Sequence, residues 1–322
     1  MTGRALQSVG RIGMGACVLV GICQVCLAPR WAPWSVLASL LSTTWVLRAA
    51  WKGARDTGLG SAVIWAGISL GLAAVSQASG ILESVESGRP ASGHWTYLSV
   101  LAALAGLISV LNARTPGGGA WAILTALLVL VFLIPWLEGP GLARRSVGLG
   151  RLRLDNPWTI FYGLLVLAGV TNYLPTRFGR ASAVLGLGFV LEYAALSRFF
   201  SDPETLARIW SAVPLCFAAA TLLAGRAAGT FEIGGSSLER LWFWFRDHWG
   251  AVWALRVMER FNRTAEAQRW PFRLTWHGCE PADSTAPDSG QAALQAAEET
   301  LRILIRRFAE PSRMDQASRD GR

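Results

Sequence analysis

The chain has 322 residues, of which 52% are hydrophobic and only 16% charged, and its mean hydropathy is +0.36. Soluble proteins carry about 25% charged residues, so this composition excludes an ordinary soluble enzyme and an intrinsically disordered chain. Five Cys are too few for a disulfide framework. Sixteen Trp are typical of a protein whose aromatic rings lie at membrane–water boundaries. The composition predicts an all-α, polytopic membrane protein that contacts the lipid bilayer.

The formal net charge of +9 is distributed unevenly along the chain. Residues 1–225 contain 16 basic and 8 acidic residues, whereas residues 226–322 contain 14 and 13. The excess of positive charge therefore lies in short loops between apolar stretches, where it sets the orientation in the membrane. A nucleic-acid-binding protein would instead gather its basic residues on one folded face, so we expect no nucleic-acid partner.

Eight stretches are apolar and long enough to be candidate spans, since a transmembrane helix needs about 17–25 mostly apolar residues. Each is bounded by charged residues, Gly or Pro, and seven or nine spans are the alternatives. Residues 1–225 are thus predicted to form a transmembrane domain. The candidate spans are 12–28, 33–50, 61–79, 96–112, 120–137, 157–175, 181–199 and 208–225.

Loop charges predict the orientation in a bacterial inner membrane. With a cytoplasmic N-terminus, eight basic residues of the transmembrane domain lie on each side, and the early loops containing Arg11, Arg48 and Lys52 favour this choice. Eight spans then place the C-terminus in the cytoplasm too, whereas the Arg-rich loop 138–156 would face outward. The first stretch could also be a signal peptide, but it lacks a clear cleavage site and another apolar stretch follows at once.

Residues 226–278 are predicted to form an amphipathic helix and a short extended segment. Ser236 and Glu239 have the spacing of a capping box, and apolar residues then recur at three- and four-residue steps. A Trp-rich stripe after the last span favours a helix that lies in the membrane interface, and packing against the protein itself is the alternative. The stripe contains Leu238, Leu241, Trp242, Phe245, Trp249, Val252 and Trp253, with Arg246, Asp247, His248 and Gly250 expected on the solvated side.

The last part of the chain is predicted to contain a second amphipathic helix, at 290–310. Before it, residues 270–276 alternate like a strand that needs a partner, and residues 279–289 have the composition of a flexible linker. The helix would either dock into a groove of a protein partner or fold back on residues 236–277. Residues 311–322 are predicted to be disordered. The helix stripe contains Leu294, Ala297, Leu301, Leu304, Ile305 and Phe308.

The sequence shows no pattern for a metal, nucleotide or other cofactor site. Its three histidines, His94, His248 and His277, do not form the facing pair that a bis-histidine haem requires. Cys23 and Cys26 have the spacing of a redox dithiol, but in an apolar stretch they are better interpreted as small packing residues. We therefore expect no cofactor and no metal.

Glu192 is the one acidic residue deep inside a predicted span. A charge at the bilayer centre costs about 2.5–3.5 kcal/mol or more, so the carboxyl group should be neutral or paired. Reflection of the chain about the tight turn after the sixth span places Tyr162 at a similar depth, with Tyr193 adjacent and Asn172 nearer the turn. The functional interpretation is a proton- or cation-linked site, and the structural one is a protonated Glu that bonds two helices together.

Two functional hypotheses follow. The first is a non-catalytic subunit or scaffold of a membrane complex, with no catalytic residue, that binds protein partners through its cytoplasmic tail. The alternative is a small-solute or proton-linked carrier, or a membrane enzyme, that uses Glu192, Tyr162, Tyr193 and Asn172. The partner-binding residues of the first hypothesis are Trp242, Phe245, Trp249 and Trp253 on one stripe and Leu301, Leu304 and Phe308 on the other.

Overall fold

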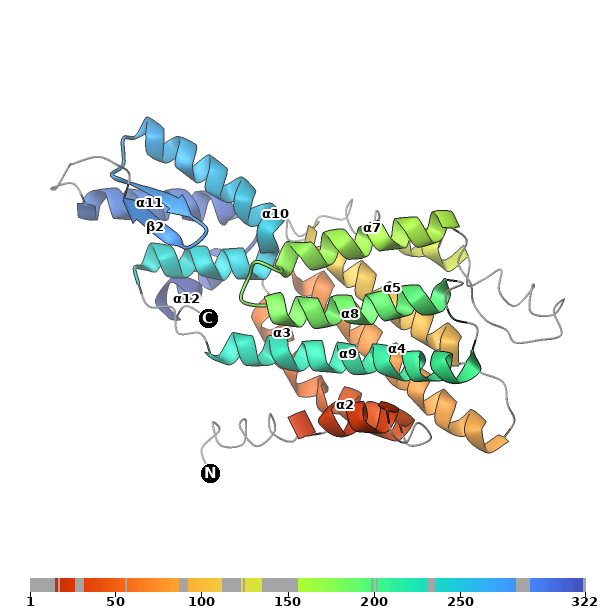
Figure 1. Cartoon of the computed structure of the whole chain (residues 1–322). Helices are drawn as coiled ribbons and strands as arrows, with labels where there is room; N and C mark the ends of the chain where they lie inside the picture. The colour runs from red at the N-terminus through yellow and green to blue at the C-terminus, as the bar shows by residue number, and fades with distance from the viewer. Residues whose placement is uncertain are drawn as a thin grey trace, which may run out of the picture.

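A computed structural model gives the arrangement of the chain (Figure 1). Within the residues that it describes the chain is helical apart from one two-stranded hairpin, which confirms the all-α prediction. The described residues are 15–16, 18–26, 32–55, 57–86, 92–111, 123, 125–134, 156–197, 200, 202–230, 235–281 and 290–320.

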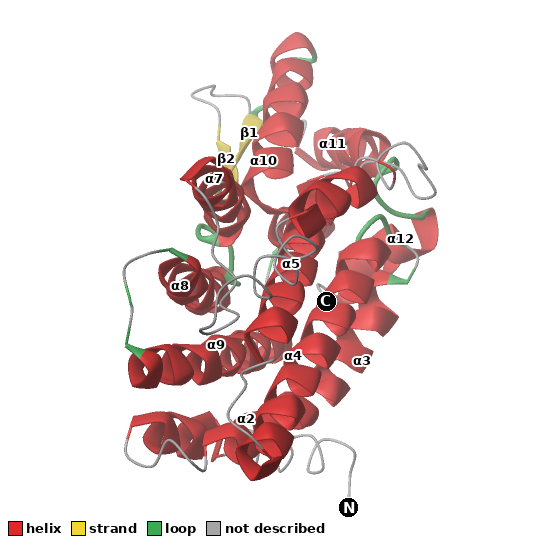
Figure 2. Cartoon of the chain, turned by 90° about the vertical axis from the view of Figure 1, so that its right-hand side faces the viewer, coloured by secondary structure: helices red, strands yellow, loops and turns green. Residues whose placement is uncertain are grey.

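The apolar part of the chain forms a bundle of helices, and a smaller domain lies against one end of it (Figures 1 and 2). Residues 18–26 and 125–134 are helical, in agreement with the first and fifth candidate spans. The other helices of the bundle are α2 (Ala32–Ser42), α3 (Thr44–Ala54), α4 (Gly60–Glu86), α5 (Ser92–Leu111), α7 (Asn156–Tyr173), α8 (Gly179–Leu196) and α9 (Pro203–Thr230).

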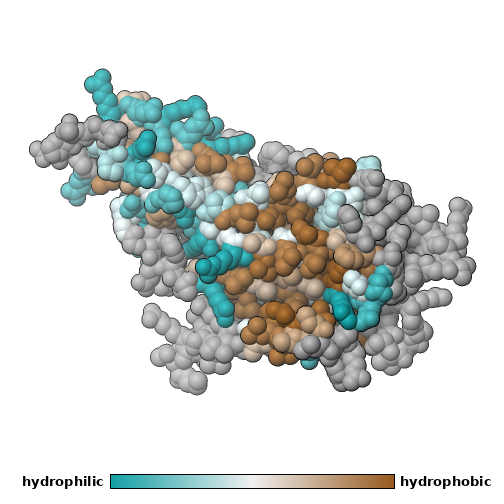
Figure 3. Space-filling view, viewed as in Figure 1, coloured by the Kyte–Doolittle hydropathy of each residue, from teal (hydrophilic) through white to brown (hydrophobic). Residues whose placement is uncertain are grey.

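Three stretches of the described helices are long and apolar enough to cross a membrane: Gly60–Ser79 in α4, all of α8, and Glu204–Ala228 in α9. Trp95–Val110 and Thr125–Ile134 are shorter apolar helices. Only 22% of the α4 stretch is buried, so most of its apolar side chains face outward. Apolar side chains cover the bundle on the face that Figure 3 shows, whereas the C-terminal domain is mainly hydrophilic. An apolar outer surface of this kind suits a helical bundle surrounded by lipid.

A single helix over the second candidate span, 33–50, is wrong, because the structure divides it into α2 and α3 at Thr43. Hydroxyl groups bond to backbone carbonyls around the break: Ser39 to Ser35 at 2.8 Å and Thr43 to Leu40 at 2.6 Å. Such bonds bend helices and also satisfy carbonyl groups that a break releases. The hydrophobicity of the stretch shows none of this, since the hydroxyl groups act locally.

Helices α7, α8 and α9 form successive antiparallel neighbours, and small residues bring them close together. Gly186 on α8 faces Val170 on α7, where an added Cβ would lie 3.1 Å from a Val170 methyl carbon. Gly188 faces α9, where a Cβ would lie 3.0 Å from the Cβ of Cys216. Helix α5 completes this core with Val100, Leu101 and Leu104. The packing fixes α8 firmly inside the bundle.

The C-terminal domain begins with α10 (Ser237–Ala267), and its N-terminus confirms the predicted capping box. The Ser236 hydroxyl accepts a hydrogen bond from the Glu239 N–H, and the Glu239 carboxylate accepts one from the Ser236 N–H. After α10 follow β1 (Phe272–Thr275), β2 (Gly278–Pro281), α11 (Gly290–Ile305) and α12 (Pro311–Asp320).

The predicted strand finds its partner within the linker that the sequence suggested at 279–289. Strands β1 and β2 pair antiparallel, with Phe272 opposite Pro281 and Thr275 opposite Gly278. The start of that segment is therefore a strand and not a flexible linker. Residues 282–289 lie outside the described part of the chain.

The expectation that residues 311–322 are disordered is wrong for 311–320, which form α12. Met314 and Ala317, three residues apart, are buried against the domain core. The Arg240 side chain donates a 2.7 Å hydrogen bond to the Ser318 carbonyl, and Arg302 on α11 forms ion pairs with Glu298 and with Asp315. Polar composition suggested disorder, but two apolar positions and these charges hold the helix in place.

Candidate functional site

Glu192 lies near one end of α8, four residues before its last residue, Leu196. At 1.5 Å per residue, the side chain is about 6 Å from the helix end that points away from the C-terminal domain. The sequence placed Glu192 close to the middle of its span, so the position is corrected toward the membrane surface. Its side chain is nonetheless fully buried.

Neither carboxyl oxygen of Glu192 has a hydrogen-bond partner among the described residues. Tyr162 on α7 is at the expected depth, but its hydroxyl group donates to the Phe189 carbonyl at 3.3 Å, one turn before Glu192. Tyr193 stacks against Tyr162 with 6.2 Å between ring centroids. A carboxylate without partners is costly to bury, so this geometry favours the neutral acid.

Tyr97 on α5 is a neighbour of Glu192 that the sequence analysis missed. It is close enough to Glu192 for an electrostatic interaction, as is Tyr162, and its hydroxyl group donates to the Phe132 carbonyl at 2.6 Å. Trp158 and Trp210 pack against Tyr97 and Leu196 at the same end of the bundle. A polar ring two residues into the fourth candidate span was the available clue, but only the packing of α5 against α8 brings it to Glu192.

Asn172, the fourth predicted polar residue, does not belong to the Glu192 site. It lies near the opposite end of α7, where its side-chain amide contacts a break in α10. Gly250 produces this break with φ 74° and ψ −175°, a backbone conformation that is essentially restricted to glycine. Asn172 Nδ2 donates to the Trp249 carbonyl at 3.4 Å, and Oδ1 accepts from the Val252 N–H at 2.9 Å. The bundle thus supplies hydrogen bonds that the broken helix lacks.

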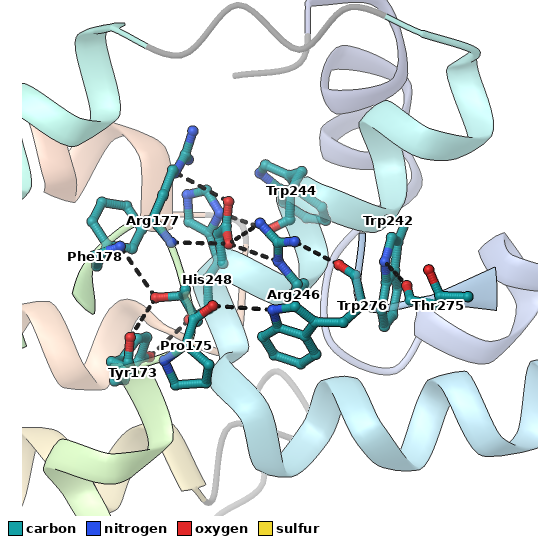
Figure 4. Close-up of polar contacts among 12 residues, drawn as sticks. Tyr173, Pro175, Arg177, Phe178, Trp242, Trp244, Arg246, His248, Thr275 and Trp276 are labelled. Atoms are coloured by element: carbon teal, nitrogen blue, oxygen red, sulfur yellow. Dashed lines mark hydrogen bonds and ion pairs between the residues drawn. The ribbon is translucent and has the colours of Figure 1, made fainter. Parts of the chain in front are cut away.

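A buried cluster of charges lies beside this contact and joins the α7–α8 turn to α10 (Figure 4). Asp247, which is fully buried, accepts a 3.0 Å hydrogen bond from Arg246 Nε and pairs with Arg177 Nε at 3.4 Å. Arg246 also donates to the Trp276 carbonyl at 2.7 Å. Burial lowers the pKa of the Arg177 guanidinium from its ordinary value, while Asp247 opposes that change. The sequence placed Arg246 and Asp247 on the solvated side, and the structure corrects this.

Neutral contacts surround the charged cluster (Figure 4). Tyr173 donates a 2.8 Å hydrogen bond to the His248 carbonyl, and Trp276 Nε1 donates to the Pro175 carbonyl at 3.1 Å. The His248 ring packs against Phe178 and Trp244, and its Nδ1 lies 2.8 Å from the Trp244 carbonyl. His248 is therefore partly buried and hydrogen-bonded, in contrast to the solvated histidine that the sequence suggested.

Both amphipathic stripes pack inside the C-terminal domain, which is the alternative that the sequence left open for each helix. Phe308 on the segment after α11 lies in the middle, with ring centroids 5.0 Å from Phe245, 5.9 Å from Trp249 and 5.3 Å from Trp253. Of the seven predicted partner-binding residues, Leu304 alone is partly buried and the others are buried: Trp242, Phe245, Trp249, Trp253, Leu301 and Phe308.

The same core continues into the ends of the bundle helices. Ala54 and Leu59, which flank the α3–α4 connection, belong to the cluster of apolar residues that contains Phe308. The Gly58 N–H donates to the Phe308 carbonyl at 2.9 Å, and Thr57 forms a β-bridge with Ala309. The C-terminal domain is thus attached to the bundle at two places, the α3–α4 connection and the α7–α8 turn.

The chain matches no protein-family model, no curated protein and no solved structure. Its function is therefore inferred from its own residues. The described part of the chain contains no group of three or more His, Cys, Asp or Glu side chains that could hold a metal ion. The chemistry that its buried groups offer is proton binding at Glu192 and, at the other end of the bundle, a rigid attachment of the C-terminal domain.

Proposed function

We propose that this protein is a multi-pass membrane protein with a proton-linked transport function centred on Glu192. The observation that carries the proposal is the fully buried Glu192 carboxyl group, whose oxygens have no hydrogen-bond partner in the described residues. Ionisable residues inside membrane helices are expensive, and they commonly belong to proton or ion pathways. A carboxyl group that is neutral when enclosed and ionised when exposed to water would carry a proton between those states.

The proposed topology has about eight spans, with α2 and α3 forming the second span as a broken helix. The α3–α4 connection, the α7–α8 turn and the C-terminal domain all lie at one end of the bundle (Figure 1). A cytoplasmic N-terminus in the inner membrane places these three regions in the cytoplasm. Glu192 would then lie in the half of the membrane that faces outward, beside Trp158 and Trp210.

The scaffold hypothesis is less favoured, because its stated binding residues are used within the chain. A scaffold that recruits partners through an apolar stripe needs that stripe on its surface. Trp249 and Leu301 have no exposed surface, so they would reach a partner only if the C-terminal domain opened. The packing of α10, α11 and α12 instead supports a domain that completes the membrane protein.

Carbodiimide labelling of the full chain in lipid vesicles tests the proton-binding role. A membrane-permeant carbodiimide reacts with protonated carboxyl groups in apolar surroundings, so Glu192 should be modified at low pH and progressively less as the pH rises. Mass spectrometry of the modified peptide measures the fraction labelled, and Glu192→Gln gives the background. Absence of labelling at every pH would contradict the proposal, because the carboxyl group would then be sealed from proton exchange.

Two substitutions separate a functional carboxyl group from a structural one. Glu192→Gln keeps the shape and the hydrogen-bonding capacity but cannot ionise, whereas Glu192→Leu removes both. The proposal expects both variants to accumulate in the membrane like the wild type, and both to lose proton uptake by vesicles under an imposed membrane potential. A harmless Gln variant together with a poorly accumulating Leu variant would show that Glu192 only holds helices together.

A further inference from the structure

A shallow apolar groove of about 340 Å³ lies between α3 and α4. These two helices run side by side along the bundle (Figure 2). Gly67 makes their close approach possible, because a Cβ there would lie 3.2 Å from a Leu47 methyl carbon. Ile64 and Trp51 remain 51% and 40% exposed in the groove. The groove is lined by Thr44, Leu47, Arg48, Trp51, Val63, Ile64 and Gly67.

The groove is near the membrane surface on the side of the C-terminal domain. The membrane-spanning stretch of α4 begins at Gly60, and the groove residues of α4 lie three to seven residues further on. At 1.5 Å per residue, the groove is about 5–10 Å inside that end of the span. Lipid headgroups meet their acyl chains at this depth.

Positive charge accompanies the apolar lining. Arg48 lines the groove, and Lys52 follows four residues later on the same face of α3, one turn closer to the membrane surface. Helix α3 contains no acidic residue. Both cationic side chains are exposed, and neither has an ion-pair partner in the part of the chain that the structure describes. An anion above the groove would therefore meet two available cations.

We propose that this groove binds one anionic phospholipid, with an acyl chain against Ile64 and Trp51 and the phosphate group at Arg48 and Lys52. Long basic side chains commonly extend along an apolar surface toward the headgroups, which suits Arg48 at this depth. The proposal needs the membrane location of the bundle but is independent of any role of Glu192. It goes beyond the proposed transport function by naming a lipid ligand and its site.

The test uses the full chain in vesicles that contain equal amounts of phosphatidylglycerol and phosphatidylcholine with identical acyl chains. After mild detergent extraction, mass spectrometry measures the ratio of the two lipids that remain with the protein. The wild type should retain phosphatidylglycerol preferentially, and each removed cation should weaken this preference about fivefold. The variant for charge is Arg48→Gln with Lys52→Gln, and the matched control is Arg260→Gln with Arg273→Gln, two exposed cations of the C-terminal domain.

Ile64→Trp separates lipid binding in the groove from attraction of headgroups alone. The larger ring should fill the groove and reduce lipid retention while both cations remain. Loss of the preference in the Arg48/Lys52 and Ile64 variants, with the control unchanged, supports the proposal. No preference in the wild type, an equal loss in the control, or full retention by Ile64→Trp overturns it. A chain that fails to insert into vesicles would contradict the membrane location, whereas inserted protein without the preference contradicts only the lipid site.

Discussion

The side-chain amide of Asn172 occupies the space directly above Gly250, in the break of α10. A Cβ at Gly250 would lie 2.3 Å from Asn172 Nδ2 and 2.6 Å from its Cγ, closer than any van der Waals contact permits. Glycine is thus required twice at this position, by its φ of 74° and by the approach of Asn172. The pair connects a membrane helix to the C-terminal domain across 78 positions of sequence.

Gly250→Ala should therefore destabilise the C-terminal domain strongly. The strained backbone conformation alone costs about 1–3 kcal/mol, and displacement of Asn172 adds the loss of its two hydrogen bonds. Thermal unfolding of the detergent-solubilised protein, followed by Trp fluorescence, measures the change. The matched control is Gly53→Ala, because Gly53 has open space around its Cα and Ala is favoured over Gly in a helix. Equal effects of the two substitutions would contradict the steric argument.

Asn172→Ala should leave the Trp249 carbonyl and the Val252 N–H without their side-chain partner, at a cost of about 1–3 kcal/mol for each group that stays unpaired. It should also relieve the clash that Gly250→Ala creates. The double variant is then less unstable than the sum of the two single variants, with a coupling of about 0.5–3 kcal/mol. Thermal unfolding of the four proteins gives this coupling, and strict additivity would show that the two residues act independently.

Asp247→Asn should destabilise the junction between the bundle and the C-terminal domain. The substitution keeps the shape of the side chain but leaves Arg177 and Arg246 buried without an opposite charge, which typically costs about 3–5 kcal/mol. Glu259→Gln is the control, because the Glu259–Arg263 ion pair is exposed and such pairs contribute about 0–1 kcal/mol. The free energy of unfolding decides, and similar losses in both variants would exclude a special role of the buried cluster.

Sequence patterns identified the features that depend on short separations along the chain. The capping box of Ser236 and Glu239 and the ion pair between Glu298 and Arg302 were predictable, since both are set by spacings of three or four residues. Helix α8 was predictable as well, because a run of apolar residues specifies it without reference to the rest of the chain.

The contacts that pack distant segments together could not be predicted in this way. Arg246 and Asp247 were expected on the solvated side because charged residues rarely lie inside, and only the α7–α8 turn gives Asp247 its second cation. Asn172 appeared to belong with Glu192 because both are polar and near the same turn. Its partner is instead α10, whose break is indicated in the sequence only by a single Gly.

Phe308→Ala should unfold the C-terminal domain at a markedly lower temperature. Phe308 is only 2% exposed and touches three aromatic rings of α10, and a buried Phe replaced by Ala costs about 3–5 kcal/mol. Ile303→Ala is the matched control, because Ile303 lies on neighbouring α11 and is 50% exposed. Protease digestion of the protein in vesicles reports on the opened domain. Unchanged resistance of the Phe308 variant would contradict the central position of this ring.

The pH dependence of stability should depend on His248. Burial, with the positive charge of Arg177 adding to it, lowers the pKa of His248 from 6.5 to about 4. Between these two values the unfolded chain binds a proton that the folded chain does not bind, so the free energy of unfolding falls as the pH falls from 6.5 toward 4. Above pH 6.5 the imidazole is neutral in both states, and the stabilising difference is fully present.

The loss over that interval is at most about 3 kcal/mol, since one pKa unit corresponds to about 1.4 kcal/mol. His248→Asn retains a donor for the Trp244 carbonyl but cannot become charged, so its unfolding temperature should change less between pH 7 and pH 4 than that of the wild type. His277→Asn, at the exposed tip of the hairpin, controls for removal of a histidine. Identical pH profiles for His248→Asn and the wild type would show that other groups, such as the carboxylates, account for the acid sensitivity of the fold.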